Sequence, residues 1–225
     1  MMLSIAHRGA SGYEPGNTLL AIRKALELDA DIIELDVQLT KDRKLVVCHD
    51  QKVWVGYKYL SITHHTLETV QMIRLAKNQH IPSLREALDL INKKAAVNIE
   101  LKDRRSAAPV CRLINEYVSK KRWGYRHFIV SSFIKDELLR IKKLSPRIRI
   151  GLLYNKPTRN LSAAIKQYKP YSVHLHFVAV TRDMVRELHE QGIKVFVWTV
   201  NSMRLIDRMR DYRVDGVFSD YPDRI

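Results

Sequence analysis

DIIELDVQLTKDRKLVVCHD, residues 31–50, is the stretch that decides how the rest of the chain is interpreted. Its apolar residues predict a strand over 32–39, a turn over 41–44 and a second short strand over 45–48. Two carboxylates, Glu34 and Asp36, interrupt the first strand. Because successive side chains of a strand alternate between its two faces, Glu34 and Asp36 point to one face and the neighbouring apolar residues to the other.

Two carboxylates on one face of a strand repel each other unless a positive group lies between them. A hard divalent cation such as Ca²⁺ or Mg²⁺, which prefers oxygen ligands, satisfies both. The alternative is a pair of surface acids on a half-exposed strand. The pair by itself leaves both interpretations open.

Strand-like and helix-like segments alternate along the whole chain. With residues 45–48 treated as an excursion from the second strand, eight principal strands are predicted, at residues 3–6, 32–39, 95–101, 128–132, 150–154, 172–177, 194–200 and 217–219. Amphipathic helices separate them, and Asn17 is the expected N-cap of the first helix. Residues 53–80 are the least regular part and contain a predicted helix at 67–75.

Strands that alternate with helices indicate βαβ units and a parallel sheet. Eight such units in 225 residues fit a (β/α)₈ barrel. A doubly wound open sheet is the alternative, but it usually has a glycine-rich nucleotide loop after its first strand, and His7-Arg8-Gly9-Ala10 has a different chemistry. We therefore predict an α/β protein, a (β/α)₈ TIM barrel with a small insertion after the second strand.

The composition is that of a soluble globular protein, with 46% hydrophobic and 28% charged residues. A single domain over residues 1–225, with the insertion at about 49–80, is expected. No apolar run approaches the ~18 residues that span a bilayer, and the N-terminus lacks the apolar stretch of a signal peptide. Two cysteines, Cys48 and Cys111, fit small core residues in a reducing compartment. The expected location is the cytoplasm.

The chain is strongly basic, with 39 Lys and Arg against 24 Asp and Glu and a net charge of +15. The excess is concentrated after Arg112, in clusters such as 120–122, 140–143 and 147–149. Such a field attracts phosphates, nucleic acid or anionic membranes. The alternative is a set of solvated helix faces, which is favoured because the clusters contain no interleaved aromatics and no nucleic-acid motif. We expect no nucleic-acid partner and at most a weak contact with an anionic membrane surface.

Polar side chains gather where the predicted strands end, which is where a barrel of this type places its catalytic groups. A single histidine or ion pair at a strand end is usually structural. Here several strand ends carry His, Arg, Glu, Asp or Lys, which chance does not readily explain; the residues are His7, Arg8, Glu34, Asp36, His49, Asp50, Glu100, Lys102, Trp198, Asn201, Ser219 and Asp220.

These residue types suit phosphoryl transfer. Three carboxylates from two neighbouring strands, Glu34, Asp36 and Glu100, can hold one hard cation. Arg8 and Lys102 can neutralise phosphate oxygens. The two histidines, His7 and His49, titrate near neutrality, so that one can activate the nucleophile while the other protonates the leaving alkoxide. Which histidine has which role stays open, as does attack by water or by a hydroxyl of the substrate.

An ordered set of motifs along nearly the whole chain resembles the glycerophosphodiester phosphodiesterase family. The motifs are HRGASGY at 7–13, NT at 17–18, ELDV at 34–37, TKD at 40–42, VVCHD at 46–50, IPSLREAL at 81–88, NIELK at 98–102, VWTVN at 197–201 and VDGVFSDYP at 214–222. No single motif is decisive, whereas the ordered set is highly specific.

The resemblance implies a (β/α)₈ barrel that hydrolyses glycerophosphodiesters to sn-glycerol 3-phosphate and an alcohol. It also implies that Glu34, Asp36 and Glu100 match the ligands of Ca²⁺ or Mg²⁺. His7 and His49 match the acid/base pair, and Arg8 and Lys102 match the phosphate-contacting residues. Trp198 matches an aromatic residue that borders the glycerol pocket. The insertion matches a segment that caps the site.

The chain departs from the family pattern at two places. Gly16 stands where the family usually has a glutamate, and residues 51–57, QKVWVGY, replace a common arginine and Thr-Thr-Gly stretch. Three other functions stay open: a lysophospholipase D-like activity that differs in the pocket around residues 54–59, a basic anion- or nucleic-acid-binding protein, and an inactive barrel. The head group, the metal ion and the oligomeric state are not predicted.

Overall fold

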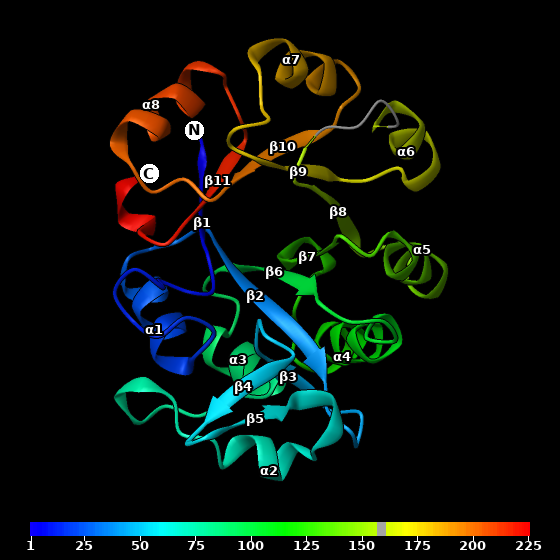
Figure 1. Ribbon diagram of the computed structural model, residues 1–225. Coiled ribbons are helices and arrows are strands. Elements are labelled where there is room, and N and C mark those ends of the chain that lie inside the picture. The colour runs from blue at the N-terminus through cyan, green and yellow to red at the C-terminus, as the bar shows by residue number, and fades with distance from the viewer. Residues whose placement is uncertain (157–160) are drawn as a thin grey trace.

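The computed structural model describes residues 1–156 and 161–225. Its centre is a closed barrel of parallel strands (Figure 1). The barrel consists of β1 (Leu3–Ala6), β2 (Ile32–Leu39), β6 (Ala96–Leu101), β7 (Phe128–Ser132), β8 (Arg149–Tyr154), β9 (Ser172–His176), β10 (Lys194–Trp198) and β11 (Gly216–Ser219). Because β1 pairs with both β2 and β11, the sheet closes on itself. The predicted (β/α)₈ barrel is confirmed, and the open doubly wound sheet is wrong.

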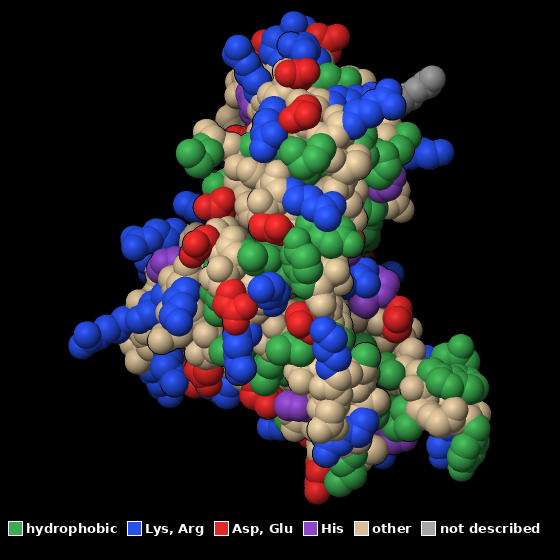
Figure 2. Space-filling model, turned by 90° about the vertical axis from the view of Figure 1, so that its left-hand side faces the viewer, with side chains coloured by type: hydrophobic (Ala, Val, Ile, Leu, Met, Phe, Trp, Pro, Cys, Tyr) green, Lys and Arg blue, Asp and Glu red, His purple; other side chains and the backbone are tan. Residues whose placement is uncertain are grey.

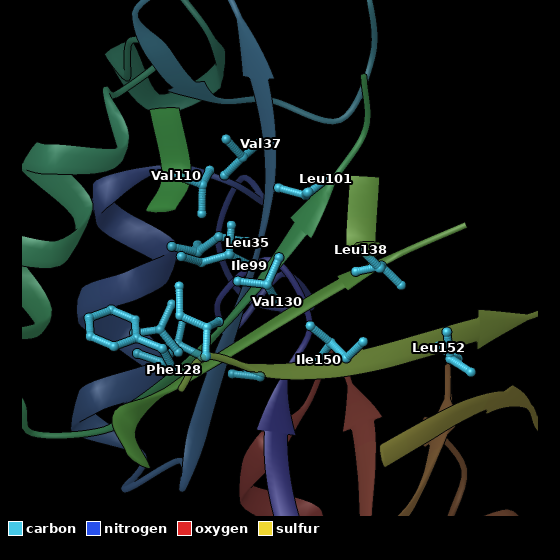
Figure 3. Close-up of a cluster of buried hydrophobic side chains, with 14 of the residues drawn as sticks. Leu35, Val37, Ile99, Leu101, Val110, Phe128, Val130, Leu138, Ile150 and Leu152 are labelled. Carbon is cyan, nitrogen blue, oxygen red and sulfur yellow. The ribbon is translucent and has the colours of Figure 1, made fainter. Parts of the chain in front are cut away.

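Helices cover the outside of the barrel, as Figure 1 shows. They are α1 (Leu19–Glu27), α3 (Leu84–Ile91), α4 (Ala107–Lys120), α5 (Lys135–Leu144), α6 (Leu161–Tyr168), α7 (Arg182–Glu190) and α8 (Met203–Asp211). The main hydrophobic core lies between these helices and the strands. Figure 3 shows part of it, where outward-facing residues of β2, β6, β7 and β8 meet Val110 of α4 and Leu138 of α5.

The residues of β2 that face the barrel interior change from apolar to acidic along the strand. Ile32 belongs to a small apolar cluster with residues of β1, β7, β10 and β11 that fills one end of the barrel. Glu34 and Asp36 share the face of Ile32 because strand side chains alternate, and each is only 2% exposed. All eight residues of β2 are buried. The interpretation of this pair as surface acids on a half-exposed strand is therefore wrong.

The insertion after the second strand forms a small unit of its own. It begins beyond β3 (Leu45–Val47), which runs antiparallel to β2 as the predicted excursion. It contains the hairpin β4 (Lys52–Val55) and β5 (Lys58–Ser61), the helix α2 (Leu67–Gln71), and 3₁₀ turns at Ile62–His64 and Ala76–Asn78. A second apolar cluster lies beneath the hairpin: Val46, Cys48, Ile62, Val70, Ile73 and Ile81. We call this cluster the insertion core.

Two local predictions are wrong. The helix expected at 67–75 ends at Gln71, because the chain turns so that the backbone N–H of Leu75 donates to the carbonyl of Gln79 at 2.7 Å. The N-cap of α1 is Thr18, whose hydroxyl accepts from the N–H of Ala21 at 3.2 Å. Asn17 adopts a positive φ of 61° instead, and its side-chain amide donates to Asp36 Oδ2 at 2.8 Å.

Within the described ranges, no helix combines the length and hydrophobicity needed to cross a membrane. Cys48 and Cys111 are both buried free thiols, as expected for core residues.

Candidate active site

A cavity of 240 Å³ opens inside the barrel at the carboxyl ends of the strands. All eight predicted site residues line it, although they come from five separate parts of the sequence: His7, Arg8, Glu34, Asp36, His49, Glu100, Lys102 and Trp198. The sequence placed these residues at strand ends, and closure of the barrel brings them to one cavity.

Three carboxylates form the most buried part of the site. Glu34 and Asp36 project from β2, and Glu100 comes from the neighbouring β6, whose register sets it directly beside Asp36. One oxygen of each group lies within 4.8 Å of the others. In the described part of the chain, Glu34 Oε1 is buried without a hydrogen-bond partner. This set of hard oxygen donors fits a Ca²⁺- or Mg²⁺-type ion.

Burial and mutual repulsion raise the pKa values of two of the three carboxylates. Burial, followed by repulsion from Asp36 and Glu100, raises the pKa of Glu34 well above its ordinary value. Burial and repulsion from Asp36 likewise raise the pKa of Glu100, although Lys102 partly offsets this. Like charges held in a low-dielectric site favour the protonated acid unless a cation is bound. The cluster is therefore compatible with a divalent metal site.

Two basic side chains border the carboxylates. The Arg8 backbone N–H donates to Glu34 Oε2 at 2.8 Å, and its Nε lies 3.1 Å from Asp36 Oδ2. Lys102 Nζ donates to Glu100 Oε1 at 2.8 Å and lies 3.5 Å from Asp36. Burial would lower the pKa of Lys102, but attraction to Glu100 and Asp36 raises it above its ordinary value. Lys102 therefore remains charged beside the cavity.

Gly16, where the chain departs from the family pattern, lies next to Arg8. A Cβ built on Gly16 would be 3.2 Å from both Arg8 Cβ and Ser11 Cβ. The backbone of Gly16 is not in the left-handed region, so no positive φ requires glycine there. Asp36 holds the Arg8 guanidinium, whereas Glu14 forms an ion pair with Lys77 at 2.6 Å.

His7 is oriented by an acid from the far end of the chain. Its Nδ1 lies 2.7 Å from Asp220 Oδ1. Burial would raise the pKa of Asp220, but hydrogen bonds from His7 and Ser11 lower it to about 2, with a further contribution from Asn201. An ionised carboxylate can only accept hydrogen bonds. His7 Nδ1 therefore carries a hydrogen, which leaves the lone pair of the neutral ring on Nε2.

His49 has a similar but more exposed arrangement. Its Nδ1 lies 2.7 Å from Oδ1 of the adjacent Asp50, whose side chain is 75% exposed. The backbone of this segment is fixed from below, because the buried Gln38 amide donates to the carbonyls of Cys48 and His49 at 2.8 and 2.9 Å. The two histidines thus share one geometry and differ in how firmly their partner acids are held.

Aromatic rings form another part of the cavity lining. Trp198, at the end of β10, packs edge-on against Phe133 and His176, with ring centroids 5.9 and 4.9 Å away. Deeper in the barrel, His174 is fully buried, and burial lowers its pKa to about 3. The His174 ring fits only because residue 151 is glycine: a Cβ there would be 2.5 Å from Nε2. His174 is therefore a neutral lining group.

Sequence reasoning missed several residues that shape the site. Asn17 donates to Asp36 Oδ2 at 2.8 Å and accepts from the Asp36 N–H at 3.2 Å, so it fixes a cluster carboxylate. Asn98, Asn155 and His174 line the cavity but were not selected. Asn98 lies on the strand that carries Glu100, two residues earlier, and strand alternation could have found it. Asn155 directly follows the predicted strand 150–154, so the strand-end criterion could have found it, whereas the buried His174 has no comparable signal.

The geometry places hard-cation ligands next to groups that can neutralise and protonate a phosphate ester, at the catalytic end of a (β/α)₈ barrel. These properties are those of TIM-barrel enzymes that hydrolyse phosphoric esters. Residues 7–224 match the model of the glycerophosphoryl diester phosphodiesterase family, and the chain belongs to this family.

Relatives and solved structures agree with the family. A glycerophosphodiester phosphodiesterase of Caldanaerobacter subterraneus is 34% identical, and the match covers 99% of this chain and 96% of the relative. An Oleispira antarctica phosphodiesterase, solved in complex with the product sn-glycerol-3-phosphate, superimposes with a TM-score of 0.89 at 26% identity over 99% and 94% of the two chains. A human lysophospholipase D is 23% identical over 98% of this chain and 84% of its own.

Proposed function

We propose that the protein hydrolyses glycerophosphodiesters to sn-glycerol 3-phosphate and an alcohol by histidine acid/base catalysis that depends on a divalent cation. The observation that carries this proposal is the meeting of three carboxylates, two cations and two histidines in one cavity. Membership of the family and the product bound by the Oleispira antarctica relative support the choice of substrate. The substrate is a small molecule, and the reaction needs no macromolecular partner.

Glu34, Asp36 and Glu100 would hold the cation, with Ca²⁺ or Mg²⁺ as the candidate ions. When bound, such an ion supplies Lewis-acid stabilisation of charge on the phosphoryl oxygens. Its binding also relieves the repulsion that raises the pKa values of Glu34 and Glu100. The cluster thus favours the uptake of positive charge, and a cation that binds displaces any proton held by Glu34.

Arg8 and Lys102 bind the phosphodiester, whose single negative charge they complement. Each already touches a cluster carboxylate, at 3.1 and 2.8 Å respectively, which restricts its motion before the substrate arrives. A guanidinium can contact two phosphate oxygens at once, whereas the ammonium acts as a compact point charge. Trp198 borders the glycerol moiety with its apolar ring. These contacts hold the phosphorus in position between the histidines.

His7 and His49 exchange the protons. One neutral imidazole takes a proton from the attacking hydroxyl while the P–O bond to the alcohol breaks, and the other, protonated, imidazole gives a proton to the departing alkoxide. In each case the carboxylate at Nδ1 leaves Nε2 to face the reaction: Asp220 for His7 and Asp50 for His49. The carboxylate also stabilises the imidazolium form of the ring. A divided acid/base role for the pair follows.

The test is release of choline and glycerol 3-phosphate from glycerophosphocholine by the purified protein. Turnover is expected with Ca²⁺ or Mg²⁺ and is expected to disappear in EDTA. His7→Ala and His49→Ala should each lower the rate by roughly 10²–10⁴-fold, the usual contribution of one proton-transfer group. His64→Ala is the matched control, because His64 is an exposed histidine of the insertion that does not line the cavity. Turnover that is unaffected by EDTA and by both histidine variants would contradict the proposal.

A lysophospholipase D-like activity is the second candidate. The observations in its favour are the likeness to a human lysophospholipase D and the exposed aromatic rings of the β4–β5 hairpin, whose Val53 lines a second cavity together with His7 and His49. The same residues would cleave the same P–O bond, and only the glycerol would carry an acyl chain. Choline release from lysophosphatidylcholine, measured beside release from glycerophosphocholine, separates the two activities.

A further inference from the structure

The β4–β5 hairpin has two chemically different faces. Its strands are paired antiparallel, with Val53 opposite Leu60 and Trp54 opposite Tyr59. Val53, Val55 and Leu60 pack on the insertion core. Trp54 and Tyr59 lie on the opposite face, with their rings edge to face at a centroid distance of 4.8 Å. The inner face thus anchors the hairpin, and the aromatic rings of the outer face are exposed.

The outer face and the turn expose large aromatic rings. Trp54 is 56% exposed, Tyr59 66% and Tyr57, beside Gly56 in the turn, 86%. Figure 2 shows hydrophobic side chains on a knob that projects at the lower right. After the 90° turn between the two views, this is where β4 and β5, at the lower front of Figure 1, are expected. We call Trp54, Tyr57 and Tyr59 the aromatic tip. Clustered apolar groups on a surface usually mark an interaction site.

The charged residues of the hairpin have one sign. Lys52 and Lys58 are both exposed; Lys52 shares the outer face with Trp54, whereas Lys58 pairs with Val55 on the inner face beside the turn. Residues 51–65 contain no Asp or Glu, and Asp50 precedes the hairpin. The whole chain has a net charge of +15. Tyr and Trp are amphipathic rings that are enriched at membrane–water interfaces, and lysines next to them attract anionic lipid head groups. A hairpin of two Tyr, one Trp and two Lys therefore complements the surface of an anionic bilayer.

The aromatic tip is attached directly to the active site. Only Asp50 and Gln51 separate His49 from Lys52 at the start of β4. Val53 of the same strand lines a second cavity, of 410 Å³, together with His7, Arg8 and His49. A surface bound by the hairpin would therefore lie close to the entrance of the catalytic cavity. The departure from the family pattern at residues 51–57 covers the first strand and the turn of this hairpin.

We propose that the aromatic tip docks the protein on anionic lipid bilayers, with Trp54, Tyr57 and Tyr59 at the head-group level and Lys52 and Lys58 against the lipid phosphates. The docking is reversible, because three rings and two lysines provide a small contact. It goes beyond the proposed hydrolysis and does not require it: binding to a bilayer is measured without turnover. Docking would keep the catalytic entrance at a surface that holds lipid-derived phosphodiesters.

The experiment is co-sedimentation with vesicles of phosphatidylcholine alone and of phosphatidylcholine in which phosphatidylserine replaces a third of the lipid. Wild type should sediment with the anionic vesicles and much less with the neutral ones, and the bound fraction should fall as salt rises. Replacing all three tip residues by alanine should weaken binding by at least 10-fold. Lys52→Glu with Lys58→Glu should weaken it by more than the roughly fivefold expected for loss of one lysine.

Matched controls separate the tip from general surface properties. Met72→Ala with Val178→Ala removes two hydrophobic side chains that are equally exposed elsewhere, 67% and 73%, and should leave binding unchanged. Lys120→Glu with Lys121→Glu makes the same charge change at the C-terminal end of α4 and should have a smaller effect than the hairpin pair. Far-UV circular dichroism and thermal unfolding check that each variant is folded.

Trp54 also reports on its own environment. Trp123 is buried, at 4% exposure, and Trp198 lines the active-site cavity, so a shift of emission to shorter wavelength with anionic vesicles should be lost in Trp54→Phe. The docking proposal is overturned if wild type does not bind the anionic vesicles, or if the tip variant binds as tightly as wild type. It is equally overturned if wild type is a dimer and the tip variant a monomer, because the tip would then be a contact between two copies.

Discussion

Replacing Glu34 by glutamine removes one charge from the carboxylate cluster and keeps the shape of the side chain. Glutamine can still accept the hydrogen bond that the Arg8 N–H donates to Glu34 at 2.8 Å. The neighbouring carboxylates, Asp36 and Glu100, each lose one like-charged partner. The substitution therefore tests the electrostatics of the cluster and its capacity for a cation with little change in packing.

The expected gain in stability without a cation follows from the geometry. The ligand oxygens of the cluster lie within 4.8 Å of one another, so two charged carboxylates repel each other by at least about 3.5 kcal/mol at an effective dielectric constant of 20. The free energy by which Glu34 destabilises the fold at pH 7 has an upper limit, because the carboxyl group can escape the repulsion by taking up a proton. From its ordinary pKa of 4.5, protonation at pH 7 costs about 3.4 kcal/mol. Arg8 offsets part of the repulsion. We therefore expect Glu34→Gln to raise the free energy of unfolding in EDTA by about 1–3 kcal/mol.

The sign of the pH dependence follows from the raised pKa of Glu34, which burial and the charges of Asp36 and Glu100 produce. Above its ordinary pKa of 4.5, the unfolded chain releases a proton that the folded protein still holds. Stability of the wild type in EDTA should therefore fall as the pH rises from about 4.5 towards the raised pKa, and then level off. The variant should lack this part of the fall.

Thermal unfolding with and without a cation provides the assay. At a free Ca²⁺ or Mg²⁺ concentration of about 100 times Kd, the wild type should gain about 2.7 kcal/mol, and the variant, which has lost a ligand, much less. For a chain of this size each kcal/mol shifts Tm by about 2–4 °C. The variant should thus melt above wild type in EDTA and lose that advantage when the cation is added.

A matched control is Glu137→Gln. Glu137 is equally buried, at 1% exposure, but it pairs with Arg140 at 2.9 Å and accepts from the Ala107 N–H. Its substitution should lower Tm both in EDTA and with the cation. Equal cation-induced shifts in wild type and Glu34→Gln would refute the metal assignment. A lower stability of Glu34→Gln in EDTA would refute the calculation of repulsion.

Three further predictions concern the residues around the carboxylate cluster. Asp220→Asn should lower kcat by roughly 10- to 100-fold, because His7 loses a charge-assisted hydrogen bond, with little change in KM. The pKa of Asp220 is lowered from 3.8 to about 2. Above pH 4 the wild type should therefore be about 2 kcal/mol more stable than Asp220→Asn, and this difference should disappear as the pH falls to 2. Urea unfolding at several pH values measures the difference. His7→Ala and His49→Ala should differ in the ratio of their kcat/KM values on glycerophosphocholine and on a nitrophenyl phosphodiester, because a good leaving group needs no general acid; identical ratios would argue against divided roles. Gly16→Glu should raise kcat/KM several-fold, because it adds a carboxylate beside Arg8 and a charge-assisted hydrogen bond contributes about 1–3 kcal/mol. Gly16→Ala tests only the 3.2 Å Cβ contacts and should leave kcat/KM unchanged. An unchanged rate in a stable Gly16→Glu variant would count against the idea that Arg8 lacks a carboxylate partner.

The sequence alone determined the barrel and the eight predicted residues that line its cavity. Both depend on short-range patterns. The two-residue period of a strand sets Glu34 and Asp36 on one face, and Glu100 and Lys102 on the same face of the next principal strand. The alternation of strands and helices then fixes a parallel barrel, and parallel strands bring all their carboxyl ends to one side. No long-range contact had to be known for these inferences.

The tertiary structure decided which groups hold the predicted residues. His7 and Asp220 are 213 positions apart and meet because β1 pairs with β11 in a register that sets Ala6 beside Ser219. Asn17 was expected to cap α1 and binds Asp36 instead, since Thr18 supplies the cap.

The hairpin of the insertion was likewise invisible in the sequence. Its strands are only four residues long, and Trp54 and Tyr59 face outwards because Val53 and Leu60 already pack on the insertion core. A local pattern fixes the direction of a side chain relative to its own strand or helix. The hydrogen-bond partner across the barrel, and the face that remains exposed, depend on strand register and on competition between neighbouring groups, which only the folded chain resolves.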